Sequence, residues 1–479
     1  MASEEKNLKK NSLISLFSLF FHSGYASLLG LVANLILTIV LTPKIYGVYV
    51  LTLAIIPFLS FFSDIGLAAS LVQKKEVSDE DVKTTFTIQQ IMVISILLVA
   101  FFLTPVMRNF YHLPPDATYL YWAVLVAFFL SSLKTIPSIK LERTIQFQKI
   151  VLVQIVESTI FYVAISVFAI LGFGLQTFTI AVLIRAIVGT VLMYALSFWV
   201  PQIGISKKSL KELLAYGVPF QTNVFLALIK DDLILFFLGK AVGLEGLAYI
   251  GWAKRWAESP IRIVMDNVSK IMFPVFSRIQ TERDRISVLL DKVIFYQTLV
   301  LAPIFVGMAL LMPEVVQLIP KYSKWEPAIP LFYLIAISAF LSSYSTPFTN
   351  LFNAVGKVKT TFKFMLYWTT MSWILVPILT HYFGLYGFPI SLIILSLTFV
   401  VILQVAKRIV PFSFVRNVVP AITASLAMGV VVYFTRGIGV NWMHIGISIM
   451  LGAVTYVLLL SVVFRVHLIR EIRTFIRYE

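Results

Sequence analysis

Charged side chains run along one face of an otherwise apolar segment, residues 246–273. At about 100° per residue, steps of 7 and 11 residues nearly complete whole helical turns. Four charged residues share one narrow stripe, because two of them lie 7 and 11 residues after the first and the other lies within one turn of its neighbours: Arg255, Glu258, Arg262 and Asp266. An Arg, Lys or Asp costs about 2.5 to 3.5 kcal/mol to place at the centre of a bilayer, so such a stripe avoids lipid. We predict that it faces a bundle interior or an aqueous cavity, as a pathway for a polar substrate.

The composition is that of a membrane-embedded chain. Of its 479 residues, 59% are hydrophobic, 14% aromatic and only 13% charged, and the mean hydropathy is +0.91. A helix of about 20 apolar residues crosses about 30 Å of hydrocarbon. We therefore expect an all-α, polytopic membrane protein of about 14 transmembrane helices. The predicted spans are 12–41, 46–72, 85–107, 119–138, 150–172, 176–200, 214–239, 246–273, 293–319, 327–351, 363–383, 385–406, 415–435 and 441–464.

The positions of the basic residues predict the orientation of the chain. Of the 39 Lys and Arg residues, 28 fall on the side of the N-terminus, 6 on the opposite side, and 5 inside spans. Cytoplasmic flanks of membrane proteins are enriched in Lys and Arg. We therefore expect a multi-pass protein of the cytoplasmic membrane with both termini in the cytoplasm. The net charge of +16 follows from this topology, so we expect no nucleic-acid partner.

Signatures of enzyme chemistry are missing from the sequence. The chain has no cysteine, and its five histidines form no metal-ligand spacing. The pairs Gly239-Lys240 and Gly356-Lys357 lack the glycine spacing and the following Ser or Thr of a phosphate-binding loop. We therefore expect no enzymatic activity, cofactor or metal, and we assign no catalytic residue.

The sequence also contains signs of duplication. Residues 43–49 and 243–249 form short, tight connections at the same place in two blocks of six spans. Repeated halves around a site near the bilayer midplane are a frequent plan in transporters. We predict one six-helix bundle over residues 1–212 and a second over 213–410. Residues 411–479 are predicted to add two transmembrane helices and a cytoplasmic tail.

Seven segments carry a family resemblance in their order along the chain. They are Leu41–Tyr49, Asp64–Lys75, Tyr216–Pro219, Tyr249–Arg255 with Pro260, Phe273–Gln280, Lys324–Pro330 and Gly356–Lys359. With these segments the chain resembles the polysaccharide repeat-unit (O-antigen type) flippases, a branch of the multidrug and toxin extrusion-like (MATE-like, MOP) transporter superfamily. The resemblance implies a flippase that moves polyprenyl-diphosphate-linked oligosaccharide repeat units across the cytoplasmic membrane by alternating access, for cell-surface polysaccharide biosynthesis.

Such a substrate implies a cavity that binds a diphosphate. Arg and Lys replace water around phosphate oxygens through charge-assisted hydrogen bonds. The cations inside the predicted spans are therefore the candidates: Arg185, Lys230, Lys254, Arg255 and Arg262. Four residues offer polar and aromatic surfaces to the sugars: Asn223, Trp252, Trp256 and Tyr249. Membrane lipids, a coupling cation (H⁺ or Na⁺) and a polysaccharide polymerase are the other expected partners.

Acidic residues in the predicted spans are candidates for ion coupling or for the cavity wall: Glu258, Asp266, Asp231, Asp232, Glu157 and Asp64. Each has a structural alternative. The acids that neighbour cations, within 230–232 and 254–266, can form buried ion pairs that set helix register. Glu157 can be a neutral carboxyl paired with Gln154. Asp64 can cap a turn.

Two other functional classes are open. An ion-coupled multidrug exporter of the same superfamily would bind cationic drugs in an acidic cavity, and the acids of the spans could serve it. A membrane-embedded glycosyltransferase or ligase would need catalytic carboxylates or histidines in a long outer loop, which the sequence lacks. The flippase interpretation instead predicts an anionic lipid-linked substrate and cationic side chains in the cavity.

Overall fold

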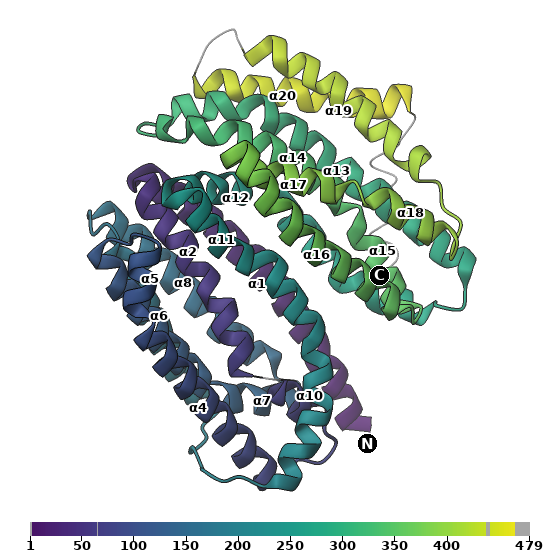
Figure 1. Cartoon of the computed structure of the whole chain (residues 1–479). Coiled ribbons are helices and arrows are strands. Elements are labelled where there is room, and N and C mark those ends of the chain that lie inside the picture. Colours follow the sequence, from purple (N-terminus) through teal and green to yellow (C-terminus); the bar gives the residue numbers. More distant parts are fainter. Residues whose placement is uncertain (1, 65, 437–440, 465–479) are drawn as a thin grey trace. The chain divides into compact units, whose positions relative to one another are not determined.

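The computed structural model describes residues 2–64, 66–436 and 441–464, and all of its regular elements in these ranges are helices (Figure 1). The side chains of residues 2–20, 216, 218–220, 222–224, 266–267, 270–271 and 274 are not described. The predicted all-α class is confirmed, whereas the predicted cytoplasmic tail after Phe464 lies outside the described residues. Contacts divide the chain into two compact units, each of which is described by itself.

The first unit comprises Met1–Gly251 and Met365–Leu385. Within it, α1 packs on α8, α8 on α9, and α6 on α9. Its helices are α1 (Ala2–Val40), α2 (Pro43–Ser63), α3 (Leu67–Gln73), α4 (Asp79–Phe102), α5 (Thr104–Phe110), α6 (Pro115–Leu133), α7 (Thr135–Arg143), α8 (Phe147–Ile170), α9 (Gln176–Leu196), α10 (Lys207–Leu228), α11 (Ile234–Ala241), the start of α12 (Gly243–Arg278) and most of α16 (Val358–Phe383).

The second unit comprises Trp252–Phe364 and Tyr386–Glu479. Here α13 packs on α19, α19 on α20, and α14 on α17. Besides most of α12, its helices are α13 (Arg283–Leu318), α14 (Ile329–Ser343), α15 (Ser345–Ala354), α17 (Gly387–Ser396), α18 (Phe399–Lys407), α19 (Phe414–Arg436) and α20 (Trp442–Leu458). The units follow contacts and not repeats, so the bundle boundaries at residues 212 and 410 stay a prediction.

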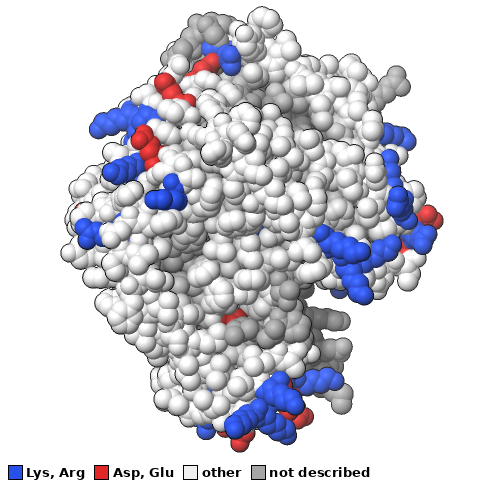
Figure 2. All heavy atoms as spheres, viewed as in Figure 1, with Lys and Arg blue, Asp and Glu red and all other residues white. Residues whose placement is uncertain are grey.

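Among the described residues, eleven helical segments are long and apolar enough to cross a membrane. The predicted spans 214–239 and 246–273 are not among them, and both contain residues whose side chains are not described. The predicted spans 363–383 and 385–406 fall in one 50-residue segment, Val358–Lys407. The multi-pass organisation is therefore confirmed, but the number of about 14 is not. On the face in Figure 2, wide areas carry no charged side chain, as a surface in contact with lipid requires.

A helix break recurs in both units at closely similar sequences. Phe129-Leu-Ser-Ser precedes the junction of α6 and α7 at Lys134, and Phe340-Leu-Ser-Ser precedes the junction of α14 and α15 at Tyr344. Each junction lies three residues before a proline, Pro137 or Pro347. A proline has no N–H for the carbonyl four residues earlier, and its ring clashes with that carbonyl, so the helix bends there.

The same hydrogen bond also accompanies each break. In the first unit, the Gln90 amide on α4 donates to the Ser132 hydroxyl (3.2 Å), and in the second, the Gln297 amide on α13 donates to the Ser343 hydroxyl (2.8 Å). A shared break with a shared polar contact supports the predicted duplication beyond the two tight connections.

Helix α10 is attached closely to α3. Gly66 has a left-handed backbone (φ +78°), and a Cβ there would overlap the backbone of Gly217. Alongside, the Gln221 amide donates to the Asp64 carbonyl (2.6 Å), and the Ser70 hydroxyl donates to the Leu213 carbonyl (2.8 Å). Glycine at both positions lets the two backbones touch. This contact explains why glycines occur in both family segments.

Lys74 joins the ends of three helices in the first unit. Its Nζ donates to Asp81 Oδ2 (2.9 Å) at the start of α4 and to Glu212 Oε2 (2.9 Å) near the start of α10. The hydrogen bond with Asp81, followed by that with Glu212, raises the pKa of Lys74 above its ordinary value. Lys74 therefore stays charged at neutral pH and holds α3 to both helices.

The two tight connections that suggested duplication contact one another. Gly47 near the start of α2 lies against Leu244 in α12, and a Cβ on Gly47 would overlap the Leu244 carbonyl. About two turns further along α12, a Cβ on Gly251 would lie 2.7 Å from Val50 Cγ2. The absence of side chains at both glycines therefore sets how closely α2 and the start of α12 approach.

The last two helices pack on α13. Gly429 of α19 faces Val306, and Gly452 of α20 faces Val432 and Met428. The Tyr456 hydroxyl donates to the Leu299 carbonyl of α13 (2.7 Å). The predicted additional helix pair is thus fixed to the second unit by close helix packing.

Candidate functional site

The charged face of α12 is a short ionic row. Helical spacing places Glu258 one turn from both Lys254 and Arg262. Its carboxylate lies 2.9 Å from Arg262 Nη2 and 3.7 Å from Lys254 Nζ. The side chains of Glu258 and Lys254 are about a quarter exposed, and that of Arg262 is 53% exposed. One carboxylate thus serves two cations in an accessible row.

Arg255 lies in the same row with a different environment. Among the described side chains, this half-buried guanidinium has no ion-pair or hydrogen-bond partner. The described part of the row therefore has three cations, Lys254, Arg255 and Arg262, against one carboxylate, and the side chain of Asp266 is not described. Such a row can bind an anion without first breaking every ion pair.

Trp252, which we expected to face sugars, anchors α12 instead. It is fully buried, its ring stacks on Trp325 (centroids 5.9 Å apart), and its indole N–H donates to the Tyr322 hydroxyl (2.9 Å). An aromatic ring buries a large apolar area when it packs in this way. The prediction that Trp252 offers a sugar-facing surface is therefore wrong for this structure.

A second charged group lies in a π-helical turn, Ile229–Leu233, between α10 and α11. Lys230 is paired with Asp231. Asp231 and Asp232 line a cavity of about 310 Å³, together with Gln221 and residues of α2. Single π-turns occur frequently at functional sites, because the wider turn redirects side chains. No feature of the sequence predicted this turn.

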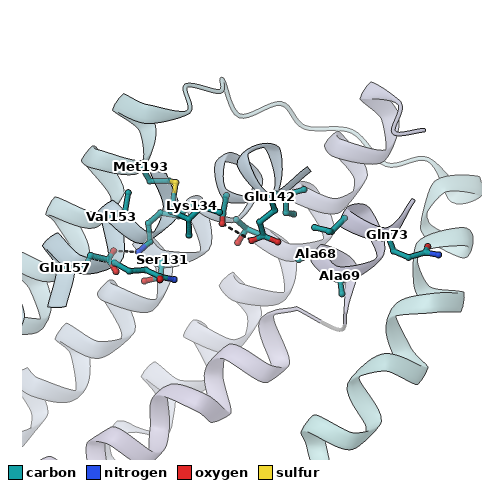
Figure 3. A pocket seen from close by; sticks show the side chains of 15 residues that line it. Ala68, Ala69, Gln73, Ser131, Lys134, Glu142, Val153, Glu157 and Met193 are labelled. Carbon is teal, nitrogen blue, oxygen red and sulfur yellow. Dashed lines mark hydrogen bonds and ion pairs between the residues drawn. The ribbon is translucent and has the colours of Figure 1, made fainter. Parts of the chain in front are cut away.

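Glu157 forms a buried ion pair with Lys134 in the first unit (Figure 3). The side chains are 9% and 16% exposed, and they lie in the wall of a cavity of about 710 Å³. The structure pairs Glu157 with Lys134 and not with Gln154, the structural alternative given above, although Gln154 also lines this cavity. Further along the wall, the Ser138 hydroxyl donates to Glu142 (3.1 Å).

Gly189 of α9 makes room for the Glu157 carboxylate. A Cβ at position 189 would overlap Glu157 Oε1. The ion pair therefore lies between the helix break at Lys134 and the backbone of α9 at Gly189, where no side chain intervenes. Because both groups are largely desolvated, removing either one would leave the other as an unpaired buried charge, which is strongly destabilising.

Lys134 is the residue that sequence reasoning missed, since we counted it with the cytoplasmic loops. The available signal was its position inside the predicted span 119–138, three residues before Pro137. A lysine shortly before a proline in a predicted span can therefore indicate a helix break that places a charged side chain inside the protein.

The remaining candidates are dispersed. Arg185 lies over the Phe161 ring (5.4 Å to its centroid) and is exposed. Asp64 accepts a hydrogen bond from the Ala68 N–H (3.0 Å) at the start of α3, which agrees with the capping alternative. Asn223 and Asp266 lie among the residues whose side chains are not described. The roles of all the candidate side chains in substrate or ion binding stay predictions.

The fold of this chain is shared with two solved transporter structures. A structure titled lipid II flippase MurJ in an inward closed conformation matches with a TM-score of 0.77 and 16% identity, over 95% of this chain and 99% of that one. An inward-facing multidrug resistance MATE family transporter matches with a TM-score of 0.63 and 15% identity, over 82% of this chain and 95% of that one.

The chain belongs to the polysaccharide biosynthesis protein family, whose model matches residues 36–330. A relative is the succinoglycan biosynthesis transport protein ExoT of Rhizobium meliloti (strain 1021), which is 23% identical over 322 residues. That match covers 67% of this chain and 65% of the relative. The matched region therefore spans slightly under two thirds of the relative's length.

Proposed function

We propose that this protein is a flippase that translocates polyprenyl-diphosphate-linked oligosaccharide repeat units across the cytoplasmic membrane by alternating access. Family membership, a relative named as a polysaccharide transport protein, and a fold shared with a lipid II flippase support this proposal. The lipid tail stays in the bilayer while the diphosphate and sugars pass through the protein. Both termini face the cytoplasm, in agreement with the distribution of Lys and Arg.

The observation that carries the proposal is the row on α12. Arg255 has no partner among the described side chains, and Glu258 is shared between Lys254 and Arg262. A diphosphate can form bidentate hydrogen bonds with Arg255 and Arg262 at little cost in existing ion pairs. Lys230, Arg185 and Asn223 are further candidates for contacts with the substrate.

The rival function is the export of cationic drugs, and a multidrug resistance MATE family transporter has a similar fold. It requires an acidic surface for the drug, whereas the described part of the α12 row has three cations and one carboxylate. The row therefore favours an anionic substrate. Export of a cationic dye by the purified protein in vesicles would favour the rival.

We further propose that a gradient of H⁺ or Na⁺ drives the cycle, with the acids among the predicted site residues as its sites. Asp231 and Asp232, in the wall of the smaller cavity, support this proposal most directly. A polysaccharide polymerase that takes up the exported repeat units is the expected protein partner.

Replacing Arg255 by Gln tests the binding role. This variant removes a charge that no described side chain balances, so we expect normal abundance in the membrane. Loss of a charge-assisted contact worth about 1.5 to 3 kcal/mol should lower export about 10- to 150-fold. Export is measured as surface polysaccharide in cells that depend on this protein, with accumulation of lipid-linked repeat units as a second readout.

Arg255→Lys is the matched control, because it keeps the charge and loses only the planar, bidentate geometry. We expect it to retain more export than Arg255→Gln. Full export by Arg255→Gln would contradict the assignment of Arg255 to the substrate. Loss of the protein from the membrane would show a structural role instead.

A further inference from the structure

The larger cavity of the first unit has a wall unlike that of a diphosphate site. Five elements line it: α3, the end of α6 with the Lys134 junction, α7, α8 and α9. One ammonium group, that of Lys134, stands against two carboxyl groups, those of Glu142 and Glu157 (Figure 3). Hence the excess of cations that a diphosphate needs is absent from this cavity wall, whose residues are all described.

The polar groups of the wall suit a ligand rich in hydroxyl groups. Two amides, Gln73 and Gln154, and the hydroxyls of Ser131, Thr135 and Ser138 join the two carboxyl groups around the cavity. A carboxylate has about four acceptor positions, so the single bonds that Glu142 and Glu157 make to Ser138 and Lys134 leave each able to accept more. Amides donate and accept at once, as neighbouring sugar hydroxyls do.

The rest of the wall is apolar, with Val153, Ile150 and Met193 beside the ion pair. A pyranose ring has C–H faces that pack on aliphatic side chains, while its hydroxyls point to the rim. The volume of about 710 Å³ falls in the range of about 300 to 1,000 Å³ that is typical of small-molecule sites. A coupling cation alone would not require a space of this size.

We propose that this cavity binds a sugar residue of the translocated oligosaccharide, with Glu142 and Glu157 accepting hydrogen bonds from its hydroxyls. The inference rests on the proposed function, and it separates the glycan contact in this cavity from the diphosphate contact on α12. Lys134 pairs with Glu157 and orients its carboxyl group, and the helix break at Lys134 places this cation in the cavity wall between α6 and α7.

Single cysteines in this cysteine-free chain test the proposal. Ala69→Cys reports on the cavity, with Ser138→Cys as a second reporter, and Ser259→Cys reports on the α12 row between Arg255 and Arg262. Thr144→Cys, exposed just beyond α7, is the matched control. Each full-length variant is placed in phosphatidylethanolamine and phosphatidylglycerol vesicles, and its rate of reaction with a maleimide is measured.

Two probes separate the contacts. One is polyprenyl diphosphate without sugars, and the other is the lipid-linked oligosaccharide fraction extracted from cells that lack this transporter. At about ten times its Kd, a ligand should slow the reaction of a covered cysteine about tenfold. We expect the oligosaccharide fraction to slow both Ala69→Cys and Ser259→Cys, and the bare lipid to slow only Ser259→Cys. Thr144→Cys should react equally throughout.

The other outcomes overturn distinct claims. Protection of Ser259→Cys alone by the oligosaccharide fraction would refute the sugar site and leave the proposed function intact. Protection of Ala69→Cys and Ser138→Cys by the bare lipid would make the cavity a lipid or diphosphate site. Their protection by NaCl, compared with choline chloride, would make it a cation site. Protection of no position by either lipid would refute the proposed function together with the inference.

Glu142→Gln sharpens the result. In the Ala69→Cys background it removes a charged acceptor, so half-maximal protection should need about tenfold more oligosaccharide fraction, equivalent to about 1.4 kcal/mol. Protection of Ser259→Cys by the bare lipid should not change, which a merely misfolded variant could not achieve. An unchanged requirement at Ala69→Cys would refute the role of Glu142.

Discussion

The helix breaks at Lys134 and at Tyr344 share a scaffold but differ in chemistry. Both follow a Phe-Leu-Ser-Ser sequence, both precede a proline by three residues, and both carry a Gln–Ser hydrogen bond to a neighbouring helix. At the first break Lys134 pairs with Glu157 in the wall of a large cavity. At the second, the Tyr344 and Thr298 hydroxyls are hydrogen-bonded (2.9 Å) and fully buried.

The comparison indicates that the helix break itself is a feature of the scaffold, and that the side chain at the break determines its chemistry. A buried hydroxyl pair closes the packing with neutral groups and contributes about 0.5 to 1.5 kcal/mol. A buried ion pair adds little net stability, because desolvation offsets the attraction, but removing one partner is strongly destabilising. Charge at the first break is therefore better explained by function than by stability.

The largest effect is expected for Lys134→Met. This change leaves the Glu157 carboxylate largely buried without its cation, and we expect a loss of about 3 to 5 kcal/mol in stability. Thermal unfolding of the purified protein in lipid nanodiscs measures the effect. The double variant Lys134→Met with Glu157→Gln removes both charges and should recover most of the stability. If Lys134→Met alone had the unfolding temperature of the wild type, the ion pair would not contribute to stability, and the two breaks would not differ in this respect.

Gly189→Ala should have an intermediate effect. The added Cβ would overlap the Glu157 carboxylate, so the ion pair must shift, at a cost of about 1 to 3 kcal/mol. Gly307→Ala in α13 is the matched control, because a Cβ there meets no atom within 4 Å. In a helix that change should be neutral or stabilising by up to about 1 kcal/mol. Equal unfolding temperatures for the two variants would show that Glu157 has another accessible position.

The smallest effect is expected at the second break, for Tyr344→Phe. The lost hydroxyl removes one hydrogen bond, while Thr298 keeps its bond to the Ile294 carbonyl (2.7 Å), so no buried donor is stranded. We expect a loss of about 1 kcal/mol, measured by the same unfolding assay, and unchanged export. A loss of export without a loss of stability would reveal a function at this break too.

Much of the fold follows from the sequence. Apolar runs separated by charged loops predicted the helices, and the tight segments at 43–49 and 243–249 coincide with the starts of α2 and α12. Interruptions within the runs were not predicted. The breaks at Lys134 and Tyr344 and the π-turn at Ile229–Leu233 depend on prolines and on packing against other helices, which average hydropathy does not record.

The candidate site was predicted unevenly. Spacing alone predicted one charged stripe on α12, and two of its members, Glu258 and Arg262, form an ion pair one turn apart, because neighbours on a single helix are determined by its period. The second cation paired with Glu258, Lys254, was not part of the predicted stripe. The sequence also singled out Glu157 as an acid in a span. Its partner lies 23 positions earlier, beyond a helix break, and only the packing of α8 against the α6–α7 junction brings the two together.

By itself, the sequence determined that this is an all-helical membrane protein and that charged residues share one face of α12. Each of these follows from local periodicity and from the cost of placing charge in lipid. Tertiary structure alone decided that Lys134 meets Glu157 beside Gly189, that Trp252 is a buried anchor, and that α3 and α10 touch through Gly66 and Gly217. These depend on contacts between helices distant in the chain, where a missing side chain or a proline sets the approach, and no single segment contains that information.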